Sequence, residues 1–216
     1  MAAREYGQYG GVPRALELVG ERWALLIVRD LLVGPRRYSE LAAGLPRIPS
    51  NILATRLKEM QDAGLLRRVP HSRVIVYELT DYGRELEPVV LALGAWGFKA
   101  LGEPRDEQII TPDSMTMDLR AAFRSNVAAN LPSTAYEARF GDAELLIRVA
   151  GSNLAVSRAD AGDGPVDLAF AAGSGIHRLI SGELAADRAI TTGAVRVLRG
   201  DARLLDRFAD TFHVAA

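Results

Sequence analysis

A short polar and cationic face follows the proline at position 49, in a stretch that has the periodicity of an α-helix. Leu53, Leu57 and Met60 recur at helical spacing and form an apolar face on one side of this predicted helix. The remaining positions carry groups that can reach base edges or phosphates in a major groove: Ser50, Asn51, Thr55 and Lys58. Such a face is also what an ordinary solvated amphipathic helix presents, so the surrounding residues must decide between the two interpretations.

Arginines precede and follow this helix along the chain. They stand in the segment before the helix and in the two β-branched runs after it: Arg36, Arg37, Arg67, Arg68 and Arg73. A guanidinium group suits phosphate geometry, so these side chains favour nucleic acid as the partner. We predict that Asn51 and Thr55 lie toward base edges of double-stranded DNA, while the arginines mainly contact phosphates.

Patterns typical of enzymes and metal sites are not found. The chain has three histidines, His71, His177 and His213, and no two of them have the spacing of metal ligands. It has no cysteine, which excludes disulfides, thiolate metal sites and thiol redox sensing. Neither a Gly-x-Ser-x-Gly frame nor a phosphate-binding glycine loop is present. The sequence therefore predicts a protein that is not an enzyme and binds no metal or cofactor.

Length, composition and charge suit two small domains. The chain has 216 residues, of which 49% are hydrophobic and 25% charged, with a formal net charge of −1. Residues 1–105 carry 15 Lys and Arg against 12 Asp and Glu, whereas residues 106–216 carry 11 against 15. This modest basic excess in the first half fits a few phosphate contacts, but not a strongly sequence-independent coating of nucleic acid.

The chain contains no apolar run of the length of a membrane span, and its first residues lack the apolar core of a secretory signal. We therefore predict a cytoplasmic protein that does not bind a membrane.

The elements around the polar face follow the order of a winged helix-turn-helix. A short helix begins near Tyr38, a second one spans 50–63, and Gly64 stands where a left-handed cap closes a helix. The runs 65–70 and 73–79 then predict a hairpin with its tip at His71 and Ser72. Before these elements, 13–19 and 22–32 predict two helices, the second buried at the centre with Trp23 in the core.

Four motifs in this region together resemble the HxlR-type family of bacterial transcriptional regulators. They are Gly-x-Arg-Trp at 20–23, Gly-Pro-Arg-Arg-Tyr-Ser-Glu-Leu at 34–41, Arg-Leu-Lys at 56–58 and Tyr-Glu-Leu-Thr at 77–80. The resemblance covers about the first hundred residues and implies DNA binding as a homodimer. Family members often carry a cysteine just before the proline near the first helix, whereas Gly10 and Gly11 stand there in this chain.

A long apolar helix is predicted from Thr80 or Asp81 to about Leu101, with Pro88 either kinking it or marking a later start. Its apolar stripe must be buried somewhere. The resemblance implies burial against the same helix and the N-terminal helix of a second subunit, through Leu16, Val19, Leu86, Val89, Val90, Leu93 and Trp96. The alternative is that the stripe packs on the C-terminal domain of its own chain.

Residues 102–112 are polar and bounded by prolines, which predicts a linker. A helix over 113–129 follows, and then alternating runs that predict strands at 134–140, 143–149, 153–158 and 166–171. A helical segment at 175–190, a fifth strand at 194–200 and a closing helix at 201–212 complete the chain. This second half is predicted to be a separate α+β domain with a five-stranded sheet.

The order of these elements weakly resembles the sterol-carrier-protein-like fold, in which an apolar cavity lies between sheet and helices. The resemblance implies a cavity for an apolar small-molecule effector, lined by Ile147, Val149, Val156, Leu168, Phe170, Ile176, Leu179 and Ile180. The alternative is that these residues fill a solid core.

The sequence thus predicts an α+β protein with a winged helix-turn-helix domain at 1–102 and a sterol-carrier-like domain at 112–216. Its predicted function is that of a ligand-responsive transcriptional regulator that binds pseudo-palindromic double-stranded DNA as a homodimer. The alternative is a protein that binds a lipid or hydrophobic metabolite, in which the winged domain mainly serves dimerisation.

Overall fold

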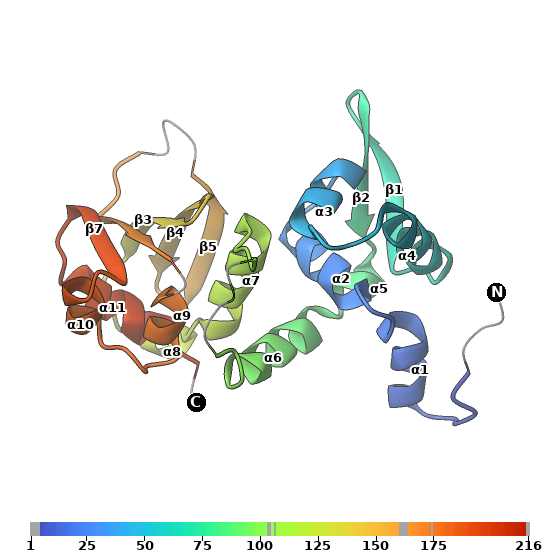
Figure 1. The fold of residues 1–216 in the computed structure, drawn as a ribbon, viewed down its shortest axis with the longest axis horizontal. Helices are drawn as coiled ribbons and strands as arrows, with labels where there is room; N and C mark the ends of the chain where they lie inside the picture. The colour runs from blue at the N-terminus through green and yellow to red at the C-terminus, as the bar shows by residue number, and fades with distance from the viewer. Residues whose placement is uncertain (1–4, 103–104, 106, 160–163, 174, 215–216) are drawn as a thin grey trace. The chain divides into compact units, whose positions relative to one another are not determined.

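The computed structural model describes residues 5–102, 105, 107–159, 164–173 and 175–214 (Figure 1). The chain divides into two units, Met1–Val90 and Leu91–Ala216. The division falls within one helix, whereas the sequence placed it in the linker at 102–112. The first unit contains these elements in order: α1 (Gly11–Val19), α2 (Ala24–Val33), α3 (Tyr38–Gly44), α4 (Ser50–Asp62), β1 (Leu66–His71), β2 (Val74–Leu79) and α5 (Asp81–Arg84).

The core of the first unit forms around α2. Ile27, Val28 and Leu31 on this helix are fully buried, as a nearly continuous hydrophobic helix must be in a small domain. Trp23 is not a core residue, because it is only half-buried at the start of α2. Its φ of 82° is unusual for a bulky residue, and the Arg22 guanidinium lies 4.8 Å from the centre of its ring.

The end of α4 and the hairpin follow the local sequence closely. Gly64 has a φ of 73°, and the Leu65 N–H donates to the Met60 carbonyl at 2.9 Å, which closes the helix. Strands β1 and β2 pair antiparallel from Leu66 opposite Leu79 to His71 opposite Val74. The turn therefore consists of residues 72 and 73, one position later than the predicted tip.

The predicted helix over 81–101 is two helices, α5 and α6 (Glu87–Phe98). Thr80 caps α5, since its hydroxyl oxygen accepts from the Gly83 N–H at 3.1 Å. Pro88 has no N–H to donate to the carbonyl of Arg84 and its ring would clash there, so a continuous helix is interrupted before it. Pro88 instead lies in the first turn of α6, where a missing N–H has no cost.

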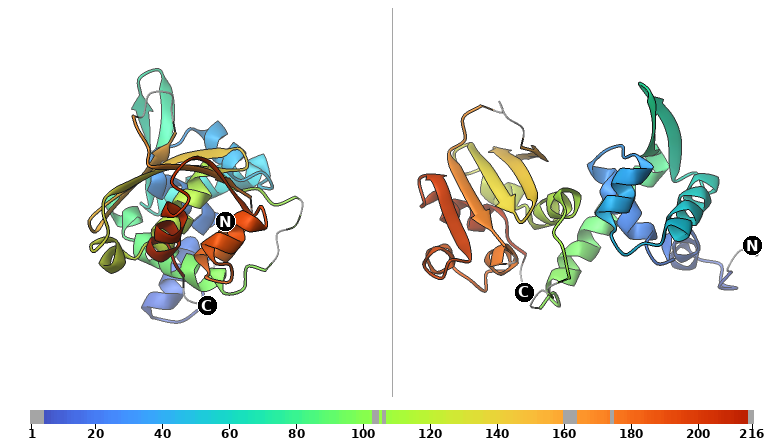
Figure 2. Two further views of the ribbon diagram at one scale, coloured as in Figure 1. Left: turned by 90° about the vertical axis from the view of Figure 1, so that its left-hand side faces the viewer. Right: turned by 45° about the horizontal axis from the view of Figure 1, so that its top comes forward.

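The second unit begins within α6 and contains a five-stranded sheet. Its further elements are α7 (Pro112–Ala122), α8 (Ser125–Ala128), β3 (Thr134–Phe140), β4 (Ala143–Ala150), β5 (Asn153–Arg158), β6 (Leu168–Ala172), α9 (Gly175–Ile180), α10 (Ala186–Thr191), β7 (Val195–Gly200) and α11 (Leu204–Thr211). The strand order is β5-β4-β3-β6-β7; the β3–β6 pair is parallel and the other pairs are antiparallel. Within this unit α9, α10 and α11 lie on one side of the sheet (Figure 2).

The core of the second unit lies between the sheet and its helices. Four aromatic rings join the two layers, with Phe208 of α11 5.3 Å from Tyr136 and 5.2 Å from Phe170, and Phe170 6.0 Å from Phe140. These edge-on contacts are favourable ring geometries. The inward strand positions are therefore occupied by close-packed side chains.

Two predicted helices of this unit are each divided. The helix expected over 113–129 ends at Ala122, because Phe123 adopts an extended conformation and forms a bridge with Phe212. The helix expected over 175–190 is interrupted around Gly182, which has a φ of 75°. Part of the predicted linker, residues 103–104 and 106, lies outside the described residues. In the described part of the chain, none of the helices has both the length and the apolarity to cross a bilayer.

Candidate nucleic-acid interface

The polar face of α4 is accessible along most of its length. Leu53, Leu57 and Met60 are buried, and this fixes which side of the helix faces the core. Asn51 and Lys58 on the other side are exposed, and Thr55 is half-buried. Residues three and four positions apart share a face, so Asn51, Thr55 and Lys58 form one row. Ser50 is exposed at the first position of the helix, but its spacing from Leu53 places it outside this row.

Hydrogen bonds order the first turns of α4. The Tyr38 hydroxyl on α3 donates to the Ser50 carbonyl at 2.8 Å and joins the two helices of the helix-turn-helix. The Thr55 hydroxyl donates to the Asn51 carbonyl at 2.8 Å. The Thr55 oxygen can still accept a hydrogen bond, while the Asn51 amide offers both donors and an acceptor. This combination suits hydrogen bonds to base edges.

A row of side chains crosses the hairpin on one face. Arg36 pairs with Tyr77 through both main-chain hydrogen bonds, of 3.0 and 2.7 Å, and so extends the hairpin by one bridge. Arg68 is opposite Tyr77 in β1, and its guanidinium lies 5.8 Å from the centre of the Tyr77 ring. Directly paired strand residues have side chains on the same face of a sheet. Arg36 and Arg68 therefore flank Tyr77 on one face.

Arg67 has a different environment. Successive strand residues face opposite sides, so Arg67 and Arg68 lie on opposite faces of this hairpin. The side chain of Arg67 pairs with Glu78 at 2.7 Å, and a phosphate would have to compete with that carboxylate. The predicted phosphate contacts of Arg67 and Arg68 remain a prediction, and the ion pair with Glu78 makes the contact of Arg67 the weaker expectation. Arg73 lies in the turn, and Arg37 lies at the start of α3 with its N–H donated to Glu40 at 2.6 Å.

Two further arginines near α4 were not selected from the sequence. Arg56 pairs with Glu59 on the same helix and with Glu21 before α2, the latter at 2.8 Å. It links α4 to the segment that contains the left-handed Trp23. Arg47 is exposed in the turn between α3 and α4. Arg47 is the cation that directly precedes α4. Its position in the turn of the helix-turn-helix could have identified it from the sequence as a further candidate for a phosphate contact.

Helix α6 has an unusual surface. Eleven of its twelve residues are uncharged and mainly apolar, yet none is buried. Val89 is 54% exposed, Leu93 46% and Trp96 72%, and their spacing places them on one face. Ala95 and Phe98, on the other side, pack against the core of the second unit. The alternative of packing within the chain therefore accounts for part of α6, and leaves the face of Val89, Leu93 and Trp96 uncovered.

The other residues predicted for dimerisation differ in accessibility. Leu16 on α1 is 44% exposed, and Leu86 and Val90 are half-buried. Val19 is buried at 7% exposure, because it is at the end of α1 where the helix meets the core of the first unit. Val19 therefore contributes to folding, and its side chain offers little surface to a partner.

The residues predicted to line a ligand cavity fill the core instead. Seven of them are buried and Val156 is partly buried against the same cluster: Ile147, Val149, Leu168, Phe170, Ile176, Leu179 and Ile180. Phe208 of α11 lies against Tyr136 and Phe170 between sheet and helix, which favours the alternative of a solid core at these positions. A cavity of about 570 Å³ does occur in the second unit, but none of the predicted residues lines it. Its walls include Ile109, Ile110, Asp118, Phe140 and His177.

The described part of the chain has no group of three or more His, Cys, Asp or Glu side chains placed to hold a metal ion. His177 is the histidine with a carboxylate beside it, since its Nε2 lies 3.5 Å from Asp118 Oδ2.

Comparisons with known proteins match the first half of the chain. Residues 18–104 match the model of the HxlR-like helix-turn-helix family. An uncharacterized HTH-type transcriptional regulator of Mycobacterium tuberculosis is 44% identical over 101 residues, which are 45% of this chain and 63% of that protein. The uncharacterized HTH-type transcriptional regulator YvaP of Bacillus subtilis is 38% identical over 86 residues, which are 38% of this chain and 80% of YvaP. The structure of the reduced form of the transcriptional regulator YodB from B. subtilis aligns with 46% of this chain and all of its own, at 33% identity and a TM-score of 0.38.

The helices α3 and α4 with the hairpin β1–β2 define a winged helix-turn-helix protein. The chain belongs to the HxlR-like helix-turn-helix family. It spans 63% of the length of the mycobacterial relative, and these matches concern its first half.

Proposed function

We propose that this protein is a transcriptional regulator that binds double-stranded DNA as a homodimer, with α4 in the major groove. The observation that carries the proposal is the accessible row of Asn51, Thr55 and Lys58 on α4, in the same unit as the Arg36–Tyr77–Arg68 face of the hairpin. Base-edge donors and acceptors on a helix, with guanidinium groups on a neighbouring hairpin, are what major-groove readout requires. The relatives named above are HTH-type transcriptional regulators, which supports the same function.

The uncovered face of α6 supports a homodimer. An apolar helix without a buried residue loses free energy to water unless another surface covers it. A second copy of the chain brings an identical apolar helix, and a twofold arrangement lets the two faces cover each other. The two α4 helices would then read half-sites about 34 Å apart in a pseudo-palindrome.

The second unit is proposed to hold a small molecule that changes DNA affinity. Its cavity of about 570 Å³ is of the size that binds small organic molecules. A ligand acts as an effector only when it binds the two DNA-binding states unequally, and a difference of about 1–3 kcal/mol changes operator affinity roughly 5- to 150-fold.

Fluorescence anisotropy with labelled duplexes tests the DNA-binding proposal. The full chain is titrated onto DNA from upstream of its own coding region and onto a random duplex of equal length. The first DNA should bind more tightly, and Asn51→Ala should remove most of that preference, because one base contact contributes about 1–3 kcal/mol of discrimination. Gln61→Ala, an exposed amide at the other end of α4, is the matched control. Equal affinity for both duplexes would contradict sequence-specific binding.

The cavity also favours a second function, a lipid or hydrophobic-metabolite binding protein in which the winged unit mainly serves dimerisation. The fluorescence-anisotropy titration described above distinguishes this function from that of a transcriptional regulator. Such a protein would bind a ligand and dimerise, yet show no preference between the two duplexes.

A further inference from the structure

We infer that the cavity of the second unit binds a neutral, mainly apolar molecule that carries a hydroxyl group, and that Asp118 and His177 bind this hydroxyl. The inference deepens the proposed effector function, on which its regulatory consequence rests. Binding itself is a separate property and can be measured without DNA.

Large apolar side chains form much of the cavity wall. Phe140 is fully buried at the end of β3, and its ring is held edge-on to Phe170 at 6.0 Å, so this part of the wall is fixed. Leu101 and Ile109 line the same cavity but are 52% and 58% exposed. Covering such side chains with an apolar ligand removes them from water and favours binding.

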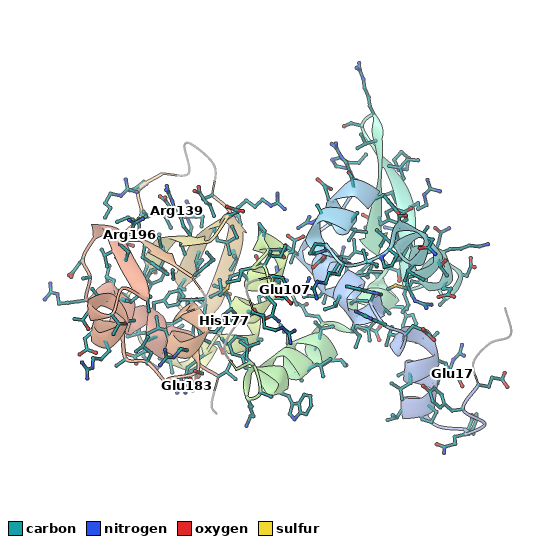
Figure 3. The ribbon with its side chains drawn as sticks, viewed as in Figure 1. Glu17, Glu107, Arg139, His177, Glu183 and Arg196 are labelled. Atoms are coloured by element: carbon teal, nitrogen blue, oxygen red, sulfur yellow. The ribbon has the colours of Figure 1, made fainter. Side chains whose placement is uncertain are left out.

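A hydrogen-bonding pair lies among these apolar groups. Asp118 belongs to α7 and His177, labelled in Figure 3, to α9; 3.5 Å separates the carboxylate Oδ2 from the imidazole Nε2. Their side chains are 31% and 17% exposed. The Phe98 ring lies 5.4 Å from the imidazole ring and limits its rotation. The pair is therefore oriented, and a ligand can still reach it.

The pair suits a hydroxyl in particular. A carboxylate only accepts hydrogen bonds, whereas an imidazole carries at least one N–H donor. A hydroxyl both donates and accepts, so it can donate to Asp118 and accept from His177 at the same time. A purely apolar ligand would take water from the pair and leave these two groups only their mutual contact at 3.5 Å, which costs free energy.

The charges of the wall disfavour an ionic ligand. Among the described residues that line the cavity, Arg105 and Arg178 balance Asp118 and Asp142. Arg178 also lies 3.9 Å from Glu183, which follows α9. A charged ligand of either sign would lose its hydration and would also meet a like charge among these four side chains. The ligand class is therefore a neutral alcohol or phenol on an apolar skeleton, which narrows the apolar small-molecule effector that the sequence predicted.

A series of compounds on one fluorescent skeleton tests the ligand class. The full chain is titrated with pyrene, pyrenemethanol, pyrenecarboxylate and pyrenemethylammonium, and binding is followed by pyrene fluorescence. The alcohol should bind about fivefold tighter than pyrene, the effect of one hydrogen bond. It should also bind more tightly than either ion. Absence of binding by the alcohol, or tightest binding by the carboxylate, would overturn the inference.

Two variants locate the site. His177→Phe keeps a ring against Phe98 but removes the N–H, so the alcohol should lose its roughly fivefold advantage while pyrene binds as before. A Cβ at Gly173 would meet no atom within 4 Å, so Gly173→Trp can occupy the cavity and should abolish binding of the alcohol and of pyrene. His71→Phe, on the hairpin of the first unit, is the matched control. Thermal denaturation verifies that each variant is folded.

The outcomes separate this inference from the proposed function. Retained preference for the alcohol in His177→Phe, or unchanged binding in folded Gly173→Trp, would place the ligand elsewhere. If the alcohol binds as expected but leaves the affinity of the protein for promoter DNA unchanged, the binding site is confirmed. The alcohol is then not an effector of DNA binding.

Discussion

Replacing Leu93 by Glu tests the homodimer at its proposed centre. Leu93 lies on the uncovered face of α6, four residues after Val89 and three before Trp96. Glu is a good helix former, and Leu93 is not part of the core of the second unit. The substitution should therefore leave the subunit folded while it places a carboxylate in the proposed interface.

The expected loss can be worked out from the exposure of Leu93. Burying a whole Leu side chain contributes about 1.5–3 kcal/mol, and Leu93 is 46% exposed. About 1 kcal/mol per subunit is therefore available on dimerisation, or roughly 2 kcal/mol for two subunits related by a twofold axis. Desolvation of two carboxylates at one interface should cost at least as much again. The total of about 4 kcal/mol raises the dimer dissociation constant about 1,000-fold.

Sedimentation velocity over a range of concentrations measures this constant. Leu198→Glu is the control, because Leu198 is 41% exposed on β7, outside α6. It should dimerise like the unmodified protein, whereas Leu93→Glu should be monomeric and bind promoter DNA weakly through single half-sites. A monomeric unmodified protein, or an unchanged dimer in Leu93→Glu, would refute the proposed role of α6.

Three further predictions concern the DNA, oxidation and pH. Arg68→Ala should reduce the magnitude of the slope of log DNA affinity against log salt concentration by about 1, whereas Arg67→Ala should change it much less. Equal changes would contradict the proposal that the hairpin face of Arg68, and not that of Arg67, contacts the DNA. Diamide should not rapidly reduce DNA affinity, because the chain has no cysteine; a loss reversed by thiol reductant would disprove this. Burial raises the pKa of Tyr136 to about 12, above the unfolded value of about 10. Stability present below pH 10 should therefore fall by about 2–3 kcal/mol as pH rises through 12, and urea denaturation of Tyr136→Phe should show a smaller fall.

The local elements of both halves were predictable because short-range rules control them. The apolar spacing of Leu53, Leu57 and Met60 determined which side of α4 is buried, and hence which polar groups remain accessible. Gly64 ended the helix where a left-handed residue was expected. The strands of the second half were found by their alternation. Long helices were predicted less well, since Pro88, Phe123 and Gly182 each divide one.

The functional surfaces depended on contacts between distant residues. Alternation along β1 already implied opposite directions for Arg67 and Arg68, but only the pairing with β2 gave them Glu78 and Tyr77 as neighbours. The apolar strand positions fitted a lined cavity or a solid core equally well, because periodicity shows which side chains face inward and not what opposes them. In the folded chain Phe208 lies against Phe170 and Tyr136, which favours a solid core at those positions.

The cavity shows most clearly that local sequence patterns do not reveal contacts between distant residues. Asp118 and His177 are 59 positions apart in the sequence, and no local pattern relates them. They meet because α7 and α9 belong to one core around the sheet. The sequence by itself thus determined the helix-turn-helix, its polar face and the α+β character of the second half, all through local periodicity. Tertiary packing alone decided where a cavity remains and which polar groups line it.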